Sequence, residues 1–224
     1  METDVATTPL SCEVPDAVPP RLHPIRDASA PLTAEHFEQL AQAKLRAKKV
    51  RRAATLAIVN VWLLGAFAIG SLLIAAAGAL FGEIDIVGLV MAAGLGLVAW
   101  NEHRGRAMLL CMRPRGCRVL GWNQLGLMVL VIGYAAWMLA QALWAPSPYA
   151  DVMAREPMLV GSLGSLDRWY RMLSLAIYGG LIVGTALFQG LNAAYYFTRR
   201  KHVVAYLRDT PEWVVQLQRR GVSV

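Results

Sequence analysis

The sequence predicts an all-α fold: a polytopic membrane protein with a four-transmembrane-helix antiparallel bundle and short cytoplasmic amphipathic helices. The chain is 56% hydrophobic and only 17% charged, whereas soluble domains carry about 25% charged residues. A helix needs about 20 apolar residues to cross a hydrocarbon layer roughly 30 Å thick. The second of four apolar runs is near the lower limit of that length and the others exceed it; the runs are Ala53–Phe81, Ile84–Trp100, Val119–Trp144 and Met172–Phe197.

The basic residues indicate how the chain is threaded. Of the 22 lysines and arginines, all but Arg155, Arg168 and Arg171 precede the first run, lie between the second and third, or follow the fourth. Positive charge is retained in the cytoplasm during insertion, so both termini and the middle loop are expected to be cytoplasmic. Because the net charge of +7 follows this threading, we expect no nucleic-acid partner. The excess of 18 arginines over 4 lysines indicates a GC-rich genome, which favours a bacterium and therefore the inner (cell) membrane.

Composition divides the chain into four segments. Residues 1–30 are rich in proline and are predicted to be a disordered cytoplasmic tail. Residues 31–52 are predicted to be a basic amphipathic helix capped by Thr33, with Phe37, Leu40 and Leu45 near one face. Residues 53–198 form the predicted transmembrane domain. Residues 199–224 form a cytoplasmic tail with a short helix that opens at Asp209-Thr210-Pro211-Glu212.

Small and polar side chains predict which face of each span points inward, because in lipid these residues rather than apolar ones drive helix association. The clearest stripe lies on the fourth span: Ser174, Tyr178, Leu181, Thr185, Gln189, Asn192 and Tyr196. The third span has a comparable stripe: Asn123, Gly126, Leu130, Gly133, Trp137 and Gln141.

A polar cluster of amides is predicted near the cytoplasmic boundary. Its members lie within about two helical turns of that boundary: Asn60, Asn123, Gln124, Gln189 and Asn192. They could line a small cavity open to the cytosol, or they could be hydrogen-bonded contacts between spans. We favour the second interpretation, because interhelical hydrogen bonds of this kind are common in membrane proteins.

The middle loop is rich in arginine. These arginines are expected mainly to anchor the loop and fix the topology, and alternatively to contact anionic lipid headgroups. Their guanidinium groups match phosphate oxygens in geometry: Arg104, Arg106, Arg113, Arg115 and Arg118. Glu102 and His103 stand beside them, which raises the alternative of phosphoryl chemistry at the membrane surface. We find no nucleophile or metal set that would complete such an enzyme site.

The spans lack the groups that most membrane chemistry needs. No Asp, Glu, Lys, Arg or His lies in the middle of any span, which argues against a proton-coupled transporter. The histidines lie outside the spans, so haem is not expected, and Cys111 with Cys117 is poorly spaced for zinc. We therefore predict no catalytic, cofactor-binding or metal-binding residues and no cofactor.

The leading functional hypothesis is a non-enzymatic scaffold or accessory subunit of a membrane complex. Its partners would be the lipid bilayer, anionic headgroups, and a protein partner or a second copy of the chain. The first alternative is a small oligomeric channel or uncoupled carrier that uses the amide cluster. The second is a lipid-modifying membrane enzyme that uses the middle loop.

Overall fold

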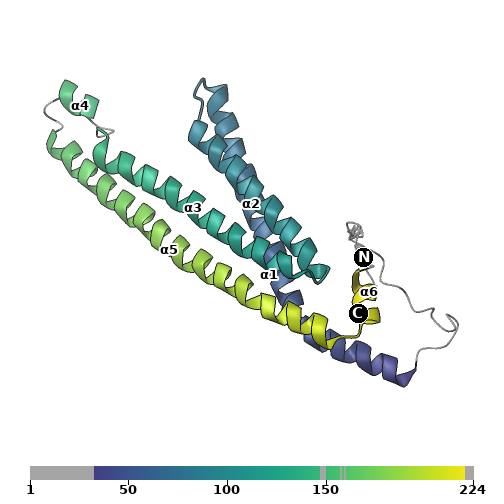
Figure 1. Ribbon diagram of the computed structural model, residues 1–224. Coiled ribbons are helices and arrows are strands. Elements are labelled where there is room, and N and C mark those ends of the chain that lie inside the picture. Colours follow the sequence, from purple (N-terminus) through teal and green to yellow (C-terminus); the bar gives the residue numbers. More distant parts are fainter. Residues whose placement is uncertain (1–32, 147–149, 157, 159, 220–224) are drawn as a thin grey trace, which may run out of the picture. The chain divides into compact units, whose positions relative to one another are not determined.

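The structure, a computed structural model, describes residues 33–146, 150–156, 158 and 160–219 (Figure 1). Four of its helices are long and apolar enough to span a membrane, and the described residues contain no strand, so the predicted all-α class with four spans is confirmed. The predicted tail 1–30 lies outside the described residues. The elements in chain order are α1 (Ala34–Leu80), α2 (Ile86–Leu110), α3 (Pro114–Trp144), α4 (Ala150–Arg155), α5 (Val160–Asp209) and α6 (Glu212–Arg219).

Two tight turns reverse the chain after α1 and after α2, and both close in the same way. In the first, Gly82 adopts a positive φ of 83° and the Glu83 amide donates to the Gly78 carbonyl at 3.0 Å. In the second, Met112 takes the left-handed position at φ 52° and the Arg113 amide donates to the Met108 carbonyl at 2.9 Å. This is the Schellman pattern, which satisfies carbonyl groups that a helix end would otherwise leave unpaired.

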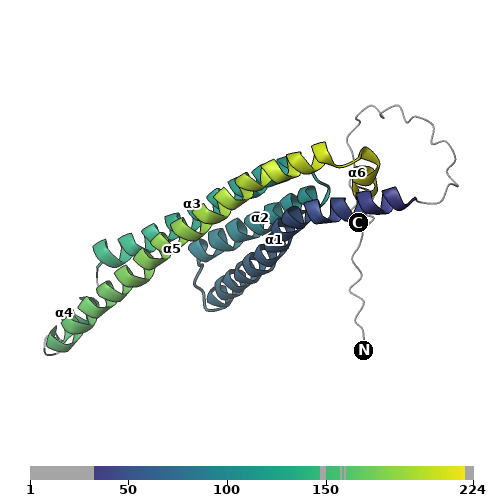
Figure 2. The ribbon, with the colours of Figure 1, turned by 90° about the horizontal axis from the view of Figure 1, so that it is seen from below.

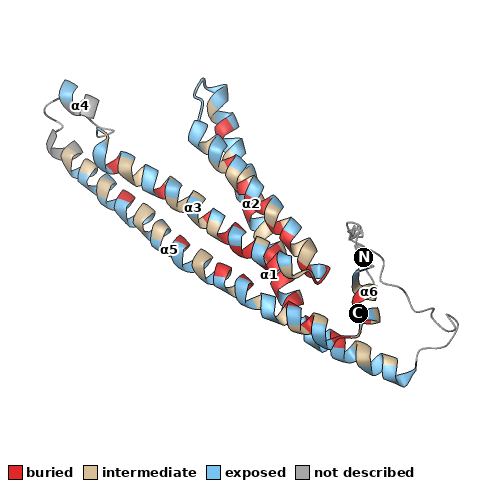
Figure 3. Cartoon of the chain, viewed as in Figure 1, coloured by how far each residue is buried: buried red, intermediate tan, exposed pale blue. Residues whose placement is uncertain are grey.

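The long helices are covered by little of the protein itself. In the most hydropathic stretch of each span only 11–22% of the residues are buried, and pale blue exposed positions run along all four (Figure 3). Trp62, Phe188 and Ile74 each expose more than 70% of their surface. Apolar patches of this extent are not stable against water and mark a lipid-facing surface. The chain is therefore a multi-pass membrane protein.

Helices α1 and α5 run without interruption past the segment boundaries expected from composition. Residues 34–52 of the expected basic helix and the start of the first span belong to one helix of 47 residues, and residues 198 and 199 both lie inside the 50-residue α5. At 1.5 Å per residue these helices are about 70 and 75 Å long, more than twice the hydrocarbon thickness. Neither proline nor glycine occurs between Ala34 and Leu64, so nothing ends the first helix at the change of composition.

The chain divides into two compact units, which we call the basic unit and the apolar unit. The basic unit comprises Met1–Asn60, Glu102–Leu120 and Tyr196–Val224, and the apolar unit comprises Val61–Asn101 and Gly121–Tyr195. By sequence, nineteen of the 22 lysines and arginines belong to the basic unit. A small cluster of Leu64, Leu95, Val98, Ala99 and Leu127 forms the core of the apolar unit.

Candidate functional site

Helix α6 is docked on the first turns of α1, within the basic unit. The indole nitrogen of Trp213 donates to Gln39 Oε1 at 3.1 Å, and its ring meets that of His36 edge-on, with centroids 5.3 Å apart. His36 Nδ1 in turn accepts a hydrogen bond from the backbone amide of Thr33, the residue before α1, and lies 2.8 Å from the Thr33 hydroxyl. Both ribbon views show α6 beside this end of α1 (Figures 1 and 2). The predicted short helix after Asp209 is thus present and packed.

The C-terminal end of α5 completes this attachment. Arg46 Nη1 donates to the backbone carbonyl of Asp209, and the Tyr206 hydroxyl donates to Gln218 Oε1 at 2.7 Å. Burial of the Tyr206 side chain raises the pKa of its phenol. The pKa of His202 on the same helix is lowered by burial and by the nearby cations, Lys49 foremost. Residues more than 160 positions apart in the sequence therefore hold α1, α5 and α6 together.

The first half of α1 buries its small residues and exposes its large ones. Ala43, Ala47 and Val50 are fully buried, at no more than 1% exposure. The face that composition predicted to be the apolar one is largely turned outward: Phe37 is 59% and Leu45 71% exposed. Helices pack closely only where the side chains between them are small, so alanine occupies the inner face. A prediction from hydropathy places the larger apolar side chains on that face instead.

A buried carboxylate joins three helices in the basic unit. Glu102, on α2, has no exposed surface. Its Oε1 accepts a hydrogen bond from the Tyr196 hydroxyl on α5 at 2.9 Å and from Asn60 Nδ2 on α1 at 3.2 Å. We call these three residues the Glu102 node. Sequence reasoning placed Glu102 only as a neighbour of the loop arginines and missed the node, whose members are 42 and 94 positions apart.

The node is suited to structure more than to chemistry. A carboxylate removed from water needs hydrogen-bond donors, and each such charge-assisted bond contributes about 1.5–3 kcal/mol. Among the described residues, no group of three or more His, Cys, Asp or Glu side chains could hold a metal ion. The Cys117 thiol in the same unit is fully buried, and this burial raises its pKa to about 11. A thiol in that state is a poor nucleophile at neutral pH.

The five predicted amides are divided between the two units. Asn60 belongs to the basic unit and donates to Glu102. Asn123, Gln124, Gln189 and Asn192 belong to the apolar unit. There Asn123 Nδ2 donates to the Val98 carbonyl at 2.9 Å and links α3 to α2. Gln124 is 1% exposed, whereas Gln189 and Asn192 are half-buried on α5. Asn60 and Asn123 thus form hydrogen bonds between helices.

The five predicted arginines all lie in the basic unit, around the turn between α2 and α3. Arg104, Arg115 and Arg118 are exposed, and Arg106 and Arg113 are half-buried. Two glycines let the helices approach closely here. A Cβ at Gly116 would lie 3.0 Å from the Gly105 carbonyl oxygen, and one at Gly105 would lie 2.6 Å from Leu120. The structure therefore gathers the arginines on one compact hairpin end.

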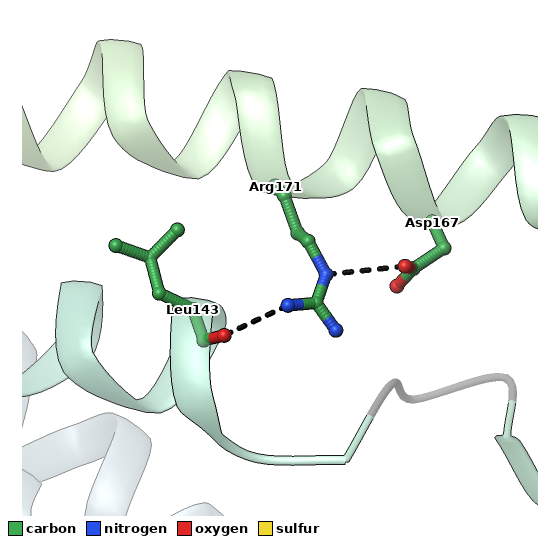
Figure 4. A network of polar contacts seen from close by, with 3 residues as sticks. All are labelled: Leu143, Asp167 and Arg171. Atoms are coloured by element: carbon green, nitrogen blue, oxygen red, sulfur yellow. Dashed lines mark hydrogen bonds and ion pairs between the residues drawn. The ribbon is translucent and has the colours of Figure 1, made fainter.

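One of the three arginines outside the basic unit has a structural partner. Arg171, on α5, forms an ion pair with Asp167 at 3.1 Å and donates from Nη1 to the Leu143 carbonyl at 2.8 Å (Figure 4). Leu143 lies in the last turn of α3, where carbonyl groups lack helical partners. A cation at a helix C-terminus is also favoured by the helix dipole. Arg171 thus fastens α5 to the end of α3.

Neither a protein-family model nor a characterised protein nor a solved structure matches this chain.

Proposed function

We propose that the chain is a non-enzymatic scaffold or accessory subunit of a complex in a bacterial inner membrane, with both termini and the basic unit in the cytoplasm. The observation that supports this most is the basic unit itself. Helices α1 and α5 continue well beyond the length that a bilayer requires, and α6 is bound to them by specific side-chain contacts. A chain that only needed anchors would not need an ordered helical unit of this size.

The polar residues support the same role. Asn60 and Asn123 donate their amides to Glu102 and to the Val98 carbonyl, which favours a structural part for them over the lining of a ligand cavity. The arginines of the α2–α3 turn are close in sequence to the end of the apolar unit and suit contact with anionic headgroups of the inner leaflet. We infer that these arginines fix the basic unit at the membrane surface and leave its remaining surface for a partner.

The test is the assembly state of the full chain extracted from its native membrane. A scaffold should migrate on a native gel as a complex with a second polypeptide, and removal of 212–224 should release that polypeptide because α6 organises the basic unit. As a matched control, Glu83→Gln in the exposed turn after α1 should leave the complex intact. If the chain is always found without a second polypeptide, the scaffold hypothesis is wrong. Solute flux into liposomes that is lost on substitution of Gln189 or Asn192 would support the channel hypothesis instead. Turnover of a lipid that is lost on substitution of Glu102 would support the enzyme hypothesis.

A further inference from the structure

A groove of about 380 Å³ lies between α2 and α3, within the apolar unit. We call it the α2–α3 groove. Apolar side chains of both helices line most of it, among them Val90 and Met91 of α2 and Leu130 of α3. Its volume is at the lower end of the range of small-molecule sites in proteins. Because both helices are membrane spans, lipid rather than water surrounds the groove, and its ligand should be largely apolar.

The two helices are in close contact at one end of the groove and lie further apart at the other. A Cβ at Gly94 of α2 would meet the side chain of Leu130 at 2.7 Å. A Cβ at Gly133, about one turn further along α3, would meet nothing within 4 Å. The groove is thus a wedge that is closed at Gly94 and opens toward Ile86, the first residue of α2.

The dimensions of the groove favour a single hydrocarbon chain over a helix. Its lining on α3 runs from Val129 to Trp137, about 12 Å along the helix axis. Over that length a helix about 10 Å across would take up about 900 Å³, more than twice the volume of the groove. A hydrocarbon chain, whose carbon atoms approach their neighbours to about 4 Å, would take up roughly 200 Å³. One chain therefore fits, and a helix does not.

Two hydrogen-bond donors line the open part of the groove, the Tyr134 hydroxyl and the Trp137 indole N–H. Among the residues that the structure describes, neither donor has a hydrogen-bonded partner. A donor that stays unpaired in lipid costs free energy, because no water is present to accept its hydrogen bond. A ligand that carries an acceptor next to its apolar chain would satisfy both requirements of the groove.

The open end of the groove lies beside a charged turn, which sets its level in the bilayer. Ile86 follows directly on the turn that holds Glu83 and Asp85, both exposed. Carboxylates stay out of the hydrocarbon, so this end is near the border where lipid ester groups lie. Trp137 is at the same level as Ile86, because both are about two helical turns from the closed end on antiparallel helices. Tryptophan is also enriched at this border.

We propose that the α2–α3 groove binds one acyl chain of a membrane phospholipid, whose ester carbonyl accepts a hydrogen bond from the Trp137 indole, with the Tyr134 hydroxyl as a second donor. The hydrocarbon of that chain extends from the open end toward Gly94, and the headgroup lies at the level of the charged turn. The inference requires only that α2 and α3 span the membrane. It is independent of the proposed scaffold function.

The experiment titrates the full chain in detergent with palmitoyl-oleoyl phosphatidylcholine, a lipid without net charge, and counts the bound lipids by native mass spectrometry. We expect one lipid to bind before all others. Gly133→Leu places a side chain in the groove and should weaken this first binding at least tenfold. Gly126→Leu is the matched control, because Gly126 is an exposed glycine of the same helix that does not line the groove. It should bind the lipid as the wild type does.

A phosphatidylcholine with ether-linked chains tests the hydrogen bond. It keeps the headgroup and the hydrocarbon but has no carbonyl groups, so we expect the wild type to bind it about threefold to tenfold more weakly than the ester-linked lipid. The double variant Y134F/W137F keeps two aromatic rings but removes both donors. It should bind the two lipids equally.

The proposal is wrong if no lipid binds before the others, or if Gly133→Leu and Gly126→Leu weaken binding equally. Equal binding of the ester-linked and ether-linked lipids by the wild type would also overturn it. A dimer in the mass spectrum that disappears in Gly133→Leu would show that a second copy of the chain occupies the groove instead. If Gly133→Leu does not fold, the comparison of the two lipids on the wild type and on Y134F/W137F still decides the matter.

Discussion

The basic unit and the apolar unit share the same four long helices but are held together by different means. In the basic unit, specific polar contacts such as those of Glu102 and Trp213 join distant helices, and Gly105 and Gly116 let backbones touch. In the apolar unit the buried cluster is small. A Cβ at Gly94 would meet the side chain of Leu130 at 2.7 Å, but one at Gly126 or Gly133 would meet nothing within 4 Å. Under the proposed placement of the basic unit in the cytoplasm, the difference reflects the solvent. In water, burying apolar side chains in a shared core lowers the free energy. In lipid these side chains are already in an apolar environment, so burying them against one another gains little.

The largest expected effect comes from breaking the Glu102 node. Glu102→Leu leaves the buried Tyr196 hydroxyl and the half-buried Asn60 amide without this acceptor, so we expect a loss of about 2–4 kcal/mol in the free energy of unfolding. Glu102→Gln keeps an acceptor oxygen and should cost about 1 kcal/mol. Equilibrium unfolding in detergent measures both. Glu83→Leu, at an exposed position of the apolar unit, is the control and should change stability by less than about 0.5 kcal/mol. A harmless Glu102→Leu would contradict the structural role of the node.

Two glycines on the same helix sharpen the comparison. Gly116→Ala places a Cβ 2.9 Å from that of Met108 and 3.0 Å from backbone atoms of α2, so we expect a destabilisation of about 1–3 kcal/mol. Gly126→Ala, ten residues later on α3, meets no atom within 4 Å and should be neutral or stabilise by up to about 1 kcal/mol through helix propensity. Thermal unfolding in nanodiscs gives both values. Equal effects at the two sites would show that the units are packed alike.

Removing the α6 anchor should act locally. Trp213→Ala deletes the hydrogen bond to Gln39 and the ring contact with His36, and we expect a cost of about 1–2 kcal/mol to the docking of α6. Hydrogen exchange should accelerate in α6 and in the first turns of α1. Trp137→Ala, on an exposed position of the apolar unit, should leave the exchange of α6 unchanged. Acceleration spread evenly over both units would argue against separate units.

The smallest expected effect is a dependence on pH. The pKa of His202 is lowered from its ordinary 6.5 by burial and by the cations Lys49, Arg199 and Lys201. The unfolded chain therefore binds a proton before the folded chain does, so the basic unit should lose stability as the pH falls through about 6.5 and below. In His202→Gln this part of the pH dependence should disappear. Unfolding of the two proteins between about pH 5 and pH 8 tests the sign, and a stability that rises with acid would contradict it.

The sequence predicted local and periodic features of this fold correctly. The four spans and the helix after Pro211 both follow from composition and capping residues. The predicted inward stripe of α5 agrees in part with the structure: Ser174, Thr185 and Tyr196 are buried, whereas Leu181 is exposed and the other members are half-buried. Regular hydropathy determines such features within one element, without reference to the rest of the chain.

Features that depend on tertiary packing were predicted less well. On α3 the expected inward stripe fails, because Gly126, Gly133 and Trp137 are exposed and of its polar residues only Asn123 is buried. The Glu102 node was missed because its partners are distant in sequence. Its one local signal was a lone carboxylate near the end of an apolar helix, with Asn60 and Tyr196 near the same ends of theirs.

The most direct test of the account asks which solvent surrounds each unit. Three single-cysteine variants, Glu83→Cys, Ile69→Cys and Lys48→Cys, are made in a background without the native cysteines and treated with a membrane-impermeant thiol reagent. We expect position 83 to react in intact cells, position 48 to react only after the membrane is opened, and position 69, an exposed site of the apolar unit, to stay unlabelled within lipid. Labelling of position 48 in intact cells, or rapid labelling of position 69, would contradict the account.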